Sequence, residues 1–145
     1  MDKEVFSSHS PEETEKVGAD LAKKLLCRSQ GSLFFITLEG GLGAGKTAFT
    51  RGVASVVSPG SRVKSPSFTI VNEYRRGEKP LFHFDLYRLG EDNDLSEIGF
   101  SEYVENGHCI IEWSEYLSED LPENSVNVNI EKTGETDRII TVTYR

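Results

Sequence analysis

Several residue types are scarce in this chain of 145 residues, and each scarcity excludes a class of protein. The two cysteines, Cys27 and Cys109, stand far apart without the spacing of a metal site, and Cys109 lies in an apolar run typical of packing. No apolar run approaches the roughly 18–20 residues that cross a bilayer. The first residues are acidic and polar, unlike a secretory signal. These features predict a cytoplasmic protein without membrane association.

Positive charge is also scarce, because 16 Lys and Arg face 24 Asp and Glu, a formal net charge of −8. Non-specific binding to nucleic acid needs clustered basic residues that displace counterions, so the composition disfavours it. A bound magnesium–nucleotide complex brings its own cation and is compatible with an acidic surface. The acidity fits either docking on a basic protein surface or solubility alone, and both interpretations stay open.

The most informative feature is the octapeptide GGLGAGKT, which matches G-x-x-x-x-G-K-[ST], the phosphate-binding P-loop. Its glycines let consecutive backbone N–H groups point at phosphate oxygens, while Lys46 reaches the β- and γ-phosphates and the Thr47 hydroxyl ligates Mg²⁺. The motif predicts a site for a nucleotide with Mg²⁺. The residues expected to bind the nucleotide are Gly40, Gly41, Leu42, Gly43, Ala44, Gly45, Lys46, Thr47 and Ala48.

The surroundings of this motif favour a P-loop over a dinucleotide fingerprint. A β-type apolar run precedes it and an amphipathic helix follows it, in the order that a P-loop requires. Gly43, Gly45 and Ala48 fit G-x-G-x-x-G/A loosely, but that motif needs an acidic residue about 20 positions later, at the end of the next strand. The chain reads KSPSFT there, so the dinucleotide interpretation fails.

Hydrophobic periodicity predicts a single α/β domain over residues 1–145, with a mixed β-sheet flanked by helices and a C-terminal β-hairpin. Ser10, Pro11 and Glu13 form a capping-box start for the first helix. The expected elements are an edge strand at 3–7, a helix at 11–27, a strand at 33–39, a helix at 46–57, strands at 68–74 and 81–88 that pair as a hairpin, an acidic helix at 94–105, a buried strand at 108–113 and the final hairpin at 125–145.

Two acidic residues are candidates for metal binding and for activating the attacking water, tasks that a P-loop leaves to carboxylates. Glu112 ends the apolar run CIIE as a Walker-B acid does, although an ordinary strand-end glutamate in solvent is the alternative. Asp85 lies within HFDLYR, where strand propensity disfavours it, so either a metal or water site or a structural bond to an arginine explains it. The same strand face carries His83, which is more often a packed, hydrogen-bonded residue than a base.

Two further segments lie near the expected site. Residues 65–69, SPSFT, follow the P-loop helix, where a segment that orders around the γ-phosphate is as consistent with the sequence as a plain serine-rich loop. Trp113 adjoins Glu112 and is expected at the edge of the nucleotide site.

Taken together, GGLGAGKTAFTRG, KSPSFTIVNEY, FHFDLYRL and IIEWSEYL resemble the bacterial TsaE family, formerly YjeE. The resemblance runs from the first helix to about Tyr116 and is weak over the C-terminal hairpin. It implies an ATP-hydrolysing subunit of tRNA threonylcarbamoyladenosine biosynthesis that works with the TsaB and TsaD proteins and meets tRNA only through them. ATP rather than another nucleotide is favoured mainly through this resemblance.

The resemblance also assigns residues. The family's P-loop Lys and Thr correspond to Lys46 and Thr47, its strand-end Glu to Glu112 and its HxDxYR Asp to Asp85, which gives Lys46, Asp85 and Glu112 catalytic roles and Thr47, Asp85 and Glu112 metal-binding roles. Its SPTF-type loop corresponds to residues 65–68.

Three positions depart from the family pattern. Ser67 replaces the usual Thr, Gly41 stands where an acid is common, and Ser114 where Pro is frequent. None of these changes removes a phosphate or metal ligand.

Two other functions fit the P-loop. A small-molecule kinase needs an acceptor pocket and usually an arginine-bearing lid, but residues 90–107, where a lid would lie, contain no Arg or Lys. A nucleotide-dependent interaction module that does not hydrolyse ATP is the other alternative, and loss of phosphate release on changing Glu112 would distinguish an ATPase from it.

Overall fold

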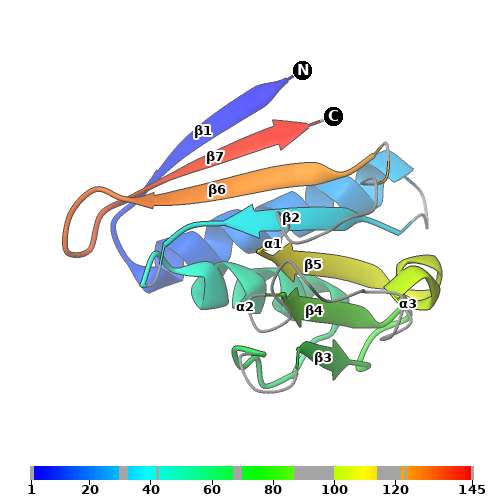
Figure 1. Ribbon diagram of the computed structural model, residues 1–145. Helices are drawn as coiled ribbons and strands as arrows, with labels where there is room; N and C mark the ends of the chain where they lie inside the picture. The colour runs from blue at the N-terminus through cyan, green and yellow to red at the C-terminus, as the bar shows by residue number, and fades with distance from the viewer. Residues whose placement is uncertain are drawn as a thin grey trace.

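The computed structural model describes residues 2–29, 33–41, 43–66, 70–86, 100–113, 122 and 124–144. They form one mixed sheet and three helices (Figure 1). The elements in chain order are β1 (Lys3–Ser8), α1 (Pro11–Ser29), β2 (Phe35–Glu39), α2 (Lys46–Val57), β3 (Val71–Tyr74), β4 (Leu81–Asp85), α3 (Phe100–Asn106), β5 (His108–Glu112), β6 (Val126–Lys132) and β7 (Arg138–Tyr144). No described helix is long and apolar enough to cross a membrane.

The sheet has the strand order β1-β7-β6-β2-β5-β4-β3. Its four central strands β6, β2, β5 and β4 run parallel, whereas β1, β7 and β3 pair antiparallel at the two sides. The mixed sheet, the edge strand β1, the β3–β4 hairpin and the C-terminal β6–β7 hairpin confirm the predicted α/β fold. The parallel centre brings the carboxyl ends of β2, β5 and β4 to one edge of the sheet.

The start of α1 shows how local sequence sets an element's position. The backbone N–H of Glu13 donates to the Ser10 hydroxyl at 3.1 Å, and Pro11 occupies the first helical position, as predicted. The Glu13 carboxylate reaches back to the N–H of His9 at 2.6 Å, one residue earlier than a capping box requires. The helix therefore begins where the sequence places it, with a variant of the expected cap.

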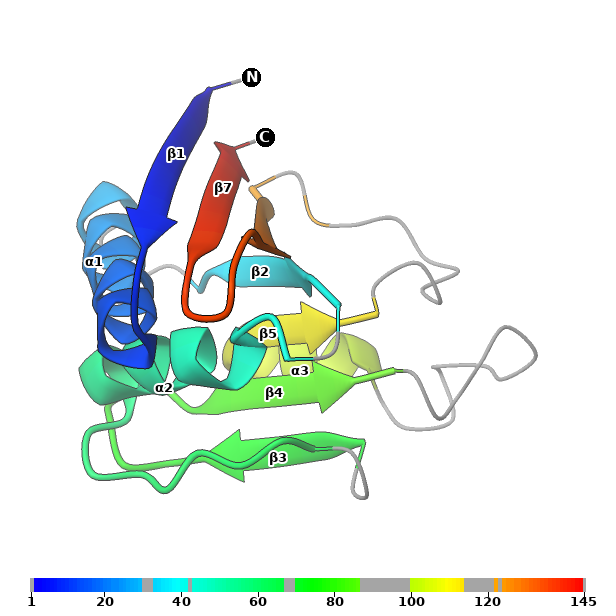
Figure 2. The same ribbon diagram turned by 90° about the vertical axis from the view of Figure 1, so that its left-hand side faces the viewer.

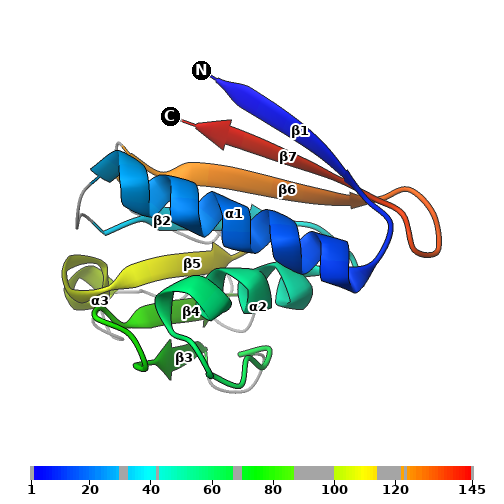
Figure 3. The same ribbon diagram turned by 180° about the vertical axis from the view of Figure 1, so that it is seen from behind.

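Helices cover the two faces of the sheet unequally. Helices α1 and α2 pack side by side on one face (Figures 1 and 3), and this face holds the larger buried cluster, with members on α1, α2 and the strands. The smaller cluster on the other face joins Phe100 of α3 to Phe82 and Phe84 of β4. Alternation along β4 and β5 accordingly turns His83, Asp85 and Glu112 toward the α2 side.

A glycine sets how closely α1 and α2 approach each other. A Cβ at Gly52 would lie 1.9 Å from the carbonyl oxygen of Glu15, a distance that atoms of a real side chain do not adopt. The backbones of the two helices therefore touch at this point, and the contact fixes the direction of α2 behind the P-loop.

Several predicted boundaries differ from the structure. The strand predicted at 33–39 begins at Phe35, and the strand predicted at 81–88 ends at Asp85, so Asp85 closes β4 instead of lying in its middle. Residues Tyr87 and Arg88 lie outside the described residues, as does the part of the predicted helix before Phe100. Cys109 is buried, and burial raises the pKa of its thiol to about 12, which confirms its packing role.

Candidate active site at the strand ends

The carboxyl ends of the three neighbouring strands place the candidate residues side by side. Leu38 of β2 pairs with Glu112 of β5, and Glu112 pairs in turn with Asp85 of β4. The P-loop leaves β2 directly after Glu39 at the same edge. The predicted position of Glu112 beside the P-loop is therefore confirmed.

The P-loop ends in a helix start built for an anion. Helix α2 begins at Lys46, as predicted. Its N-cap Gly45 has φ 106°, a left-handed backbone conformation that residues with a side chain rarely adopt. The first N–H groups of any helix have no intrahelical acceptor, and Gly45 has no side chain that could cap those of α2. These N–H groups and the positive end of the helix dipole suit a phosphate group.

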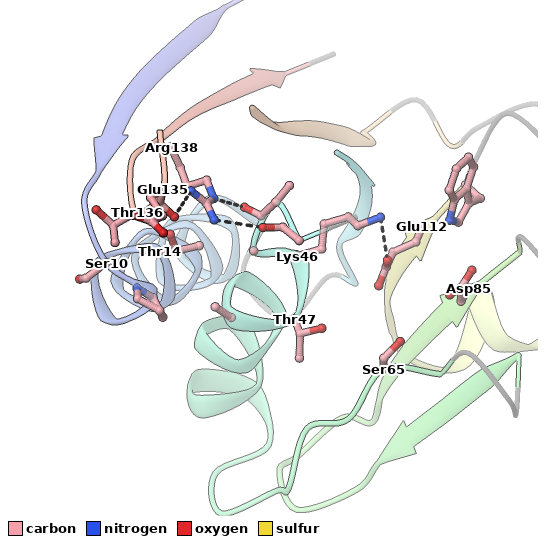
Figure 4. A pocket seen from close by; sticks show the side chains of 16 residues that line it. Ser10, Thr14, Lys46, Thr47, Ser65, Asp85, Glu112, Glu135, Thr136 and Arg138 are labelled. Carbon is pink, nitrogen blue, oxygen red and sulfur yellow. Dashed lines mark hydrogen bonds and ion pairs between the residues drawn. The ribbon is translucent and has the colours of Figure 1, made fainter. Parts of the chain in front are cut away.

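A chain of three side chains, the half-buried Lys46 and the buried Glu112 and His83, links the P-loop to two strands. Lys46 Nζ lies 3.3 Å from Glu112 Oε1 (Figure 4), and His83 Nε2 lies 2.5 Å from Glu112 Oε2. Glu112 and His83 are 5% and 0% exposed. The Glu112 carboxylate is therefore held at both oxygens, which excludes the alternative of a strand-end glutamate in solvent.

The pKa of Glu112 reflects this enclosure. Burial alone would raise the pKa of the Glu112 carboxyl, but the hydrogen bond from His83 and the charge of Lys46 outweigh burial and hold it below its ordinary value of 4.5. Glu112 is thus an ionised, buried carboxylate whose charge is balanced by its neighbours rather than by water.

The residue after Glu112 also faces Lys46. Lys46 Nζ lies 5.5 Å from the centre of the Trp113 ring, within cation–π range. Trp113 has φ 62°, which is unusual for a residue other than glycine and is found mostly where surrounding structure enforces it. The lysine therefore contacts both the acid and the indole predicted at the nucleotide edge.

A cavity of about 790 Å³ opens onto these groups. At one end it is lined by Glu112, Asp85 and Ser65, and at the other by Ser10 and Thr14 of the α1 start together with the β6–β7 turn. Lys46 and Thr47 lie between these two groups (Figure 4). The volume is within the range of pockets that enclose a small-molecule ligand.

One pocket residue, Arg138 at the start of β7, was not predicted from the sequence. Its guanidinium donates to the carbonyl oxygens of Ala44 and Gly43 at 2.9 and 3.0 Å, and to those of the turn before it at 2.9–3.3 Å. Figure 2 shows this β6–β7 turn beside the start of α1, and Figure 4 shows Arg138 pointing at the P-loop. The hairpin thereby anchors the P-loop backbone. No local signal marks Arg138, because its partners lie 94 and 95 residues earlier in the chain.

Comparison with known proteins identifies the family. The family model "Threonylcarbamoyl adenosine biosynthesis protein TsaE" matches residues 8–140. The chain belongs to the TsaE family. The match extends through most of the C-terminal hairpin, beyond the limit near Tyr116 that the sequence motifs indicated. Arg138 of that hairpin anchors the P-loop, which gives the hairpin a physical link to the rest of the TsaE-type site.

Individual TsaE relatives agree over most of the chain. The tRNA threonylcarbamoyladenosine biosynthesis proteins TsaE of Bacillus subtilis and Haemophilus influenzae are 38% and 37% identical, covering 92% and 88% of this chain and 81% and 83% of their own lengths. The crystal structure of Bacillus subtilis YdiB matches with a TM-score of 0.77 at 33% identity, covering 99% of this chain and 86% of that one. The fold is therefore that of a solved relative.

The predicted TsaE site residues come together where the structure describes them. Lys46, Thr47, Asp85, Glu112 and Trp113 all line the cavity, as do four others of the predicted nucleotide-binding residues, Gly43, Ala44, Gly45 and Ala48. Gly40 and Gly41 lie in the loop before them and are not cavity-lining residues. Leu42 of the P-loop, Ser67 and Phe68 of the SPSF segment, and Ser114 lie outside the described residues. Their predicted roles stay predictions.

The donor set fits a magnesium–nucleotide complex. Thr47, Asp85 and Glu112 offer oxygen atoms, which Mg²⁺ prefers, and Mg²⁺ commonly uses one or two carboxylates together with substrate phosphates. No group of three or more His, Cys, Asp or Glu side chains suited to a metal ion occurs among the described residues. An ion at this site would take the rest of its ligands from phosphate and water.

Proposed function

We propose that the chain is a Mg²⁺-dependent ATPase that takes part in tRNA threonylcarbamoyladenosine biosynthesis together with the TsaB and TsaD proteins. Membership of the TsaE family supports the role in this pathway. The observation that carries the ATPase assignment is the P-loop Lys46 beside the buried acid Glu112 in one cavity, with a second strand-end acid, Asp85.

Different residues of the chain would bind the phosphate groups, the metal ion and the attacking water. The N–H groups at the start of α2 and the Lys46 ammonium hold and orient phosphate groups, while the cavity end near Ser10 and Thr14 leaves space for the nucleoside. Thr47, Glu112 and Asp85 would hold Mg²⁺, which neutralises charge on the phosphates when bound. The acidic groups at the strand ends also accept hydrogen bonds from an attacking water, which orients it.

The positions of the described arginines favour a partner protein that assists hydrolysis. Arg138 is the arginine among the described cavity-lining residues, and its donors face backbone carbonyls instead of the phosphate end. Arg51 points to Glu15 on α1 at 3.9 Å. An arginine supplied by a partner raises phosphoryl transfer by about 10³–10⁵-fold in other P-loop proteins. We therefore expect slow hydrolysis by the chain alone and stimulation by TsaB and TsaD.

The test measures phosphate release from ATP, with and without Mg²⁺ and with and without TsaB and TsaD, alongside nucleotide binding. Lys46→Ala should abolish productive nucleotide binding, because it removes the ammonium that faces the phosphates. Lys23→Ala on the exposed face of α1 is the matched control and should bind normally. Unchanged ATP affinity and turnover in Lys46→Ala would overturn the assignment of the site.

A further inference from the structure

His83 is a fully buried histidine whose single described hydrogen bond goes to the candidate active-site acid. Its Nε2 lies 2.5 Å from Glu112 Oε2, and its Nδ1 has no hydrogen-bond partner among the described residues. An ionised carboxylate only accepts hydrogen bonds, so Nε2 carries the hydrogen and donates it. A buried nitrogen without a partner among the described residues costs free energy, so space filling alone does not explain a histidine at this position.

The strand register explains why His83 reaches this carboxylate. His83 pairs with Ile110, two residues before Glu112, while Asp85 pairs with Glu112 itself. The imidazole therefore bonds diagonally across the two parallel strands to a side chain on the same face of the sheet. Both strands are buried along their whole length, so their backbones offer a rigid support.

The Lys46 ammonium cannot bind Glu112 and the phosphate groups of a nucleotide with equal strength at the same time. The P-loop lysine contacts Glu112 Oε1, whereas His83 contacts Oε2. An ammonium that turns to phosphate groups loosens its hold on Oε1, and the bond to Oε2 is then the contact that keeps the carboxylate from rotating.

We propose that His83 is the positioning residue that keeps Glu112 aimed at the nucleotide when Lys46 engages phosphate. The proposal rests on the ATPase function above and assigns His83 no contact with substrate. Residues that orient a metal-binding group typically change metal affinity or activity by about 10–100-fold when they are replaced. His83→Leu should therefore lower kcat by about 10–100-fold and raise the Mg²⁺ concentration for half-saturation, while ADP still binds with nearly its usual affinity.

Three variants separate positioning from simple structural support. His83→Gln restores an N–H donor near the position of Nε2 and should recover most of kcat. His83→Leu removes the donor but fills the space. His108→Leu is the matched control, because His108 is an equally buried histidine at the beginning of the neighbouring strand, away from the cavity. Urea unfolding of each variant reports any general loss of stability.

The decisive measurement is a double-mutant cycle with phosphate release and Mg²⁺-dependent ADP binding as readouts. If His83 acts through Glu112, His83→Leu should have little further effect on kcat in a Glu112→Gln background. Independent, additive losses, or a His83→Leu variant with the kcat and Mg²⁺ dependence of the wild type, would overturn the proposal. A wild-type chain that releases no phosphate, alone or with TsaB and TsaD, would instead refute the proposed function.

Discussion

Two buried histidines on neighbouring strands of the same sheet have opposite surroundings. His83 of β4 donates to the carboxylate of Glu112 near the cavity, whereas His108 at the start of β5 stacks on Phe34 and accepts the N–H of Phe34 at 3.0 Å. Burial, and secondarily the charge of Lys79, lowers the pKa of His108 to about 4. The same residue type is thus part of a charged network at one end of the sheet and a neutral packing group at the other.

The difference shows that burial alone does not identify a functional residue. Both histidines are at most 3% exposed, so exposure cannot distinguish them. What distinguishes them is the partner: His108 accepts a backbone N–H, whereas His83 donates to an ionised side chain beside the P-loop lysine, within the proposed active site.

The largest expected effect lies at the cavity end. Glu112→Gln keeps the shape of the side chain but removes its charge, so we expect kcat for ATP hydrolysis to fall by about 10²–10³-fold, the size of losing one strong electrostatic contact to a transition state. ATP binding should persist, because Lys46 loses a competing partner. The measurement is phosphate release with TsaB and TsaD present.

Glu39→Gln is the control for this prediction, because Glu39 also ends a central strand but is exposed. If both variants hydrolyse ATP at the wild-type rate, Glu112 is no more important for hydrolysis than the exposed Glu39. The end of the sheet beside the cavity would then have no special role in catalysis.

The next largest effect is expected at the opposite end of the sheet, at His108, and concerns the stability of the fold at acidic pH. The folded pKa of His108, about 4, lies below its unfolded value of 6.5, so the unfolded chain binds the extra proton first and stability falls as the pH drops from 6.5 toward 4. Between pH 7.5 and 5 this amounts to about 2 kcal/mol. Protonation of Nδ1 would also break the bond from Phe34.

Urea unfolding of the wild type and of His108→Leu at both pH values checks this point. The variant should be less stable at pH 7.5, since the Phe34 N–H loses its acceptor, yet it should lose less stability than the wild type on going to pH 5. An equal loss in both proteins would show that His108 is not the packing residue we describe.

The smallest expected effect concerns the anchor between the hairpin and the P-loop. Arg138→Lys keeps the charge but loses the planar fork that reaches two P-loop carbonyls, so nucleotide affinity should fall by about 10-fold, the equivalent of one or two ordinary hydrogen bonds. Titration of Trp113 fluorescence with ADP measures it, since Trp113 lines the cavity. The same change at exposed Arg62 should leave affinity unaltered; equal affinities in all three proteins would exclude an anchoring role.

Local patterns predicted much of the fold and part of the site. The helix over Lys46–Val57 begins and ends where its sequence indicates, and the alternation in the last two strands gives the hairpin. Asp85 was misplaced within its strand because a two-residue period cannot show where pairing stops. His83 was interpreted as a packed histidine, since nothing in HFDLYR indicates that Glu112, 29 residues later, lies within hydrogen-bond distance.

The sequence by itself determined the phosphate-binding motif, because the glycines, the lysine and the hydroxyl of a P-loop are contiguous in the chain. Only the tertiary structure decided which other groups meet that loop. The parallel pairing of β2, β5 and β4 brings Glu112 and Asp85 to the edge of the P-loop. The register of β4 against β5 places His83 within hydrogen-bond distance of Glu112, and the last hairpin brings Arg138 to the carbonyl groups of the loop. Such contacts depend on strand order and register, which are set by packing of the whole sheet and not by neighbours in sequence.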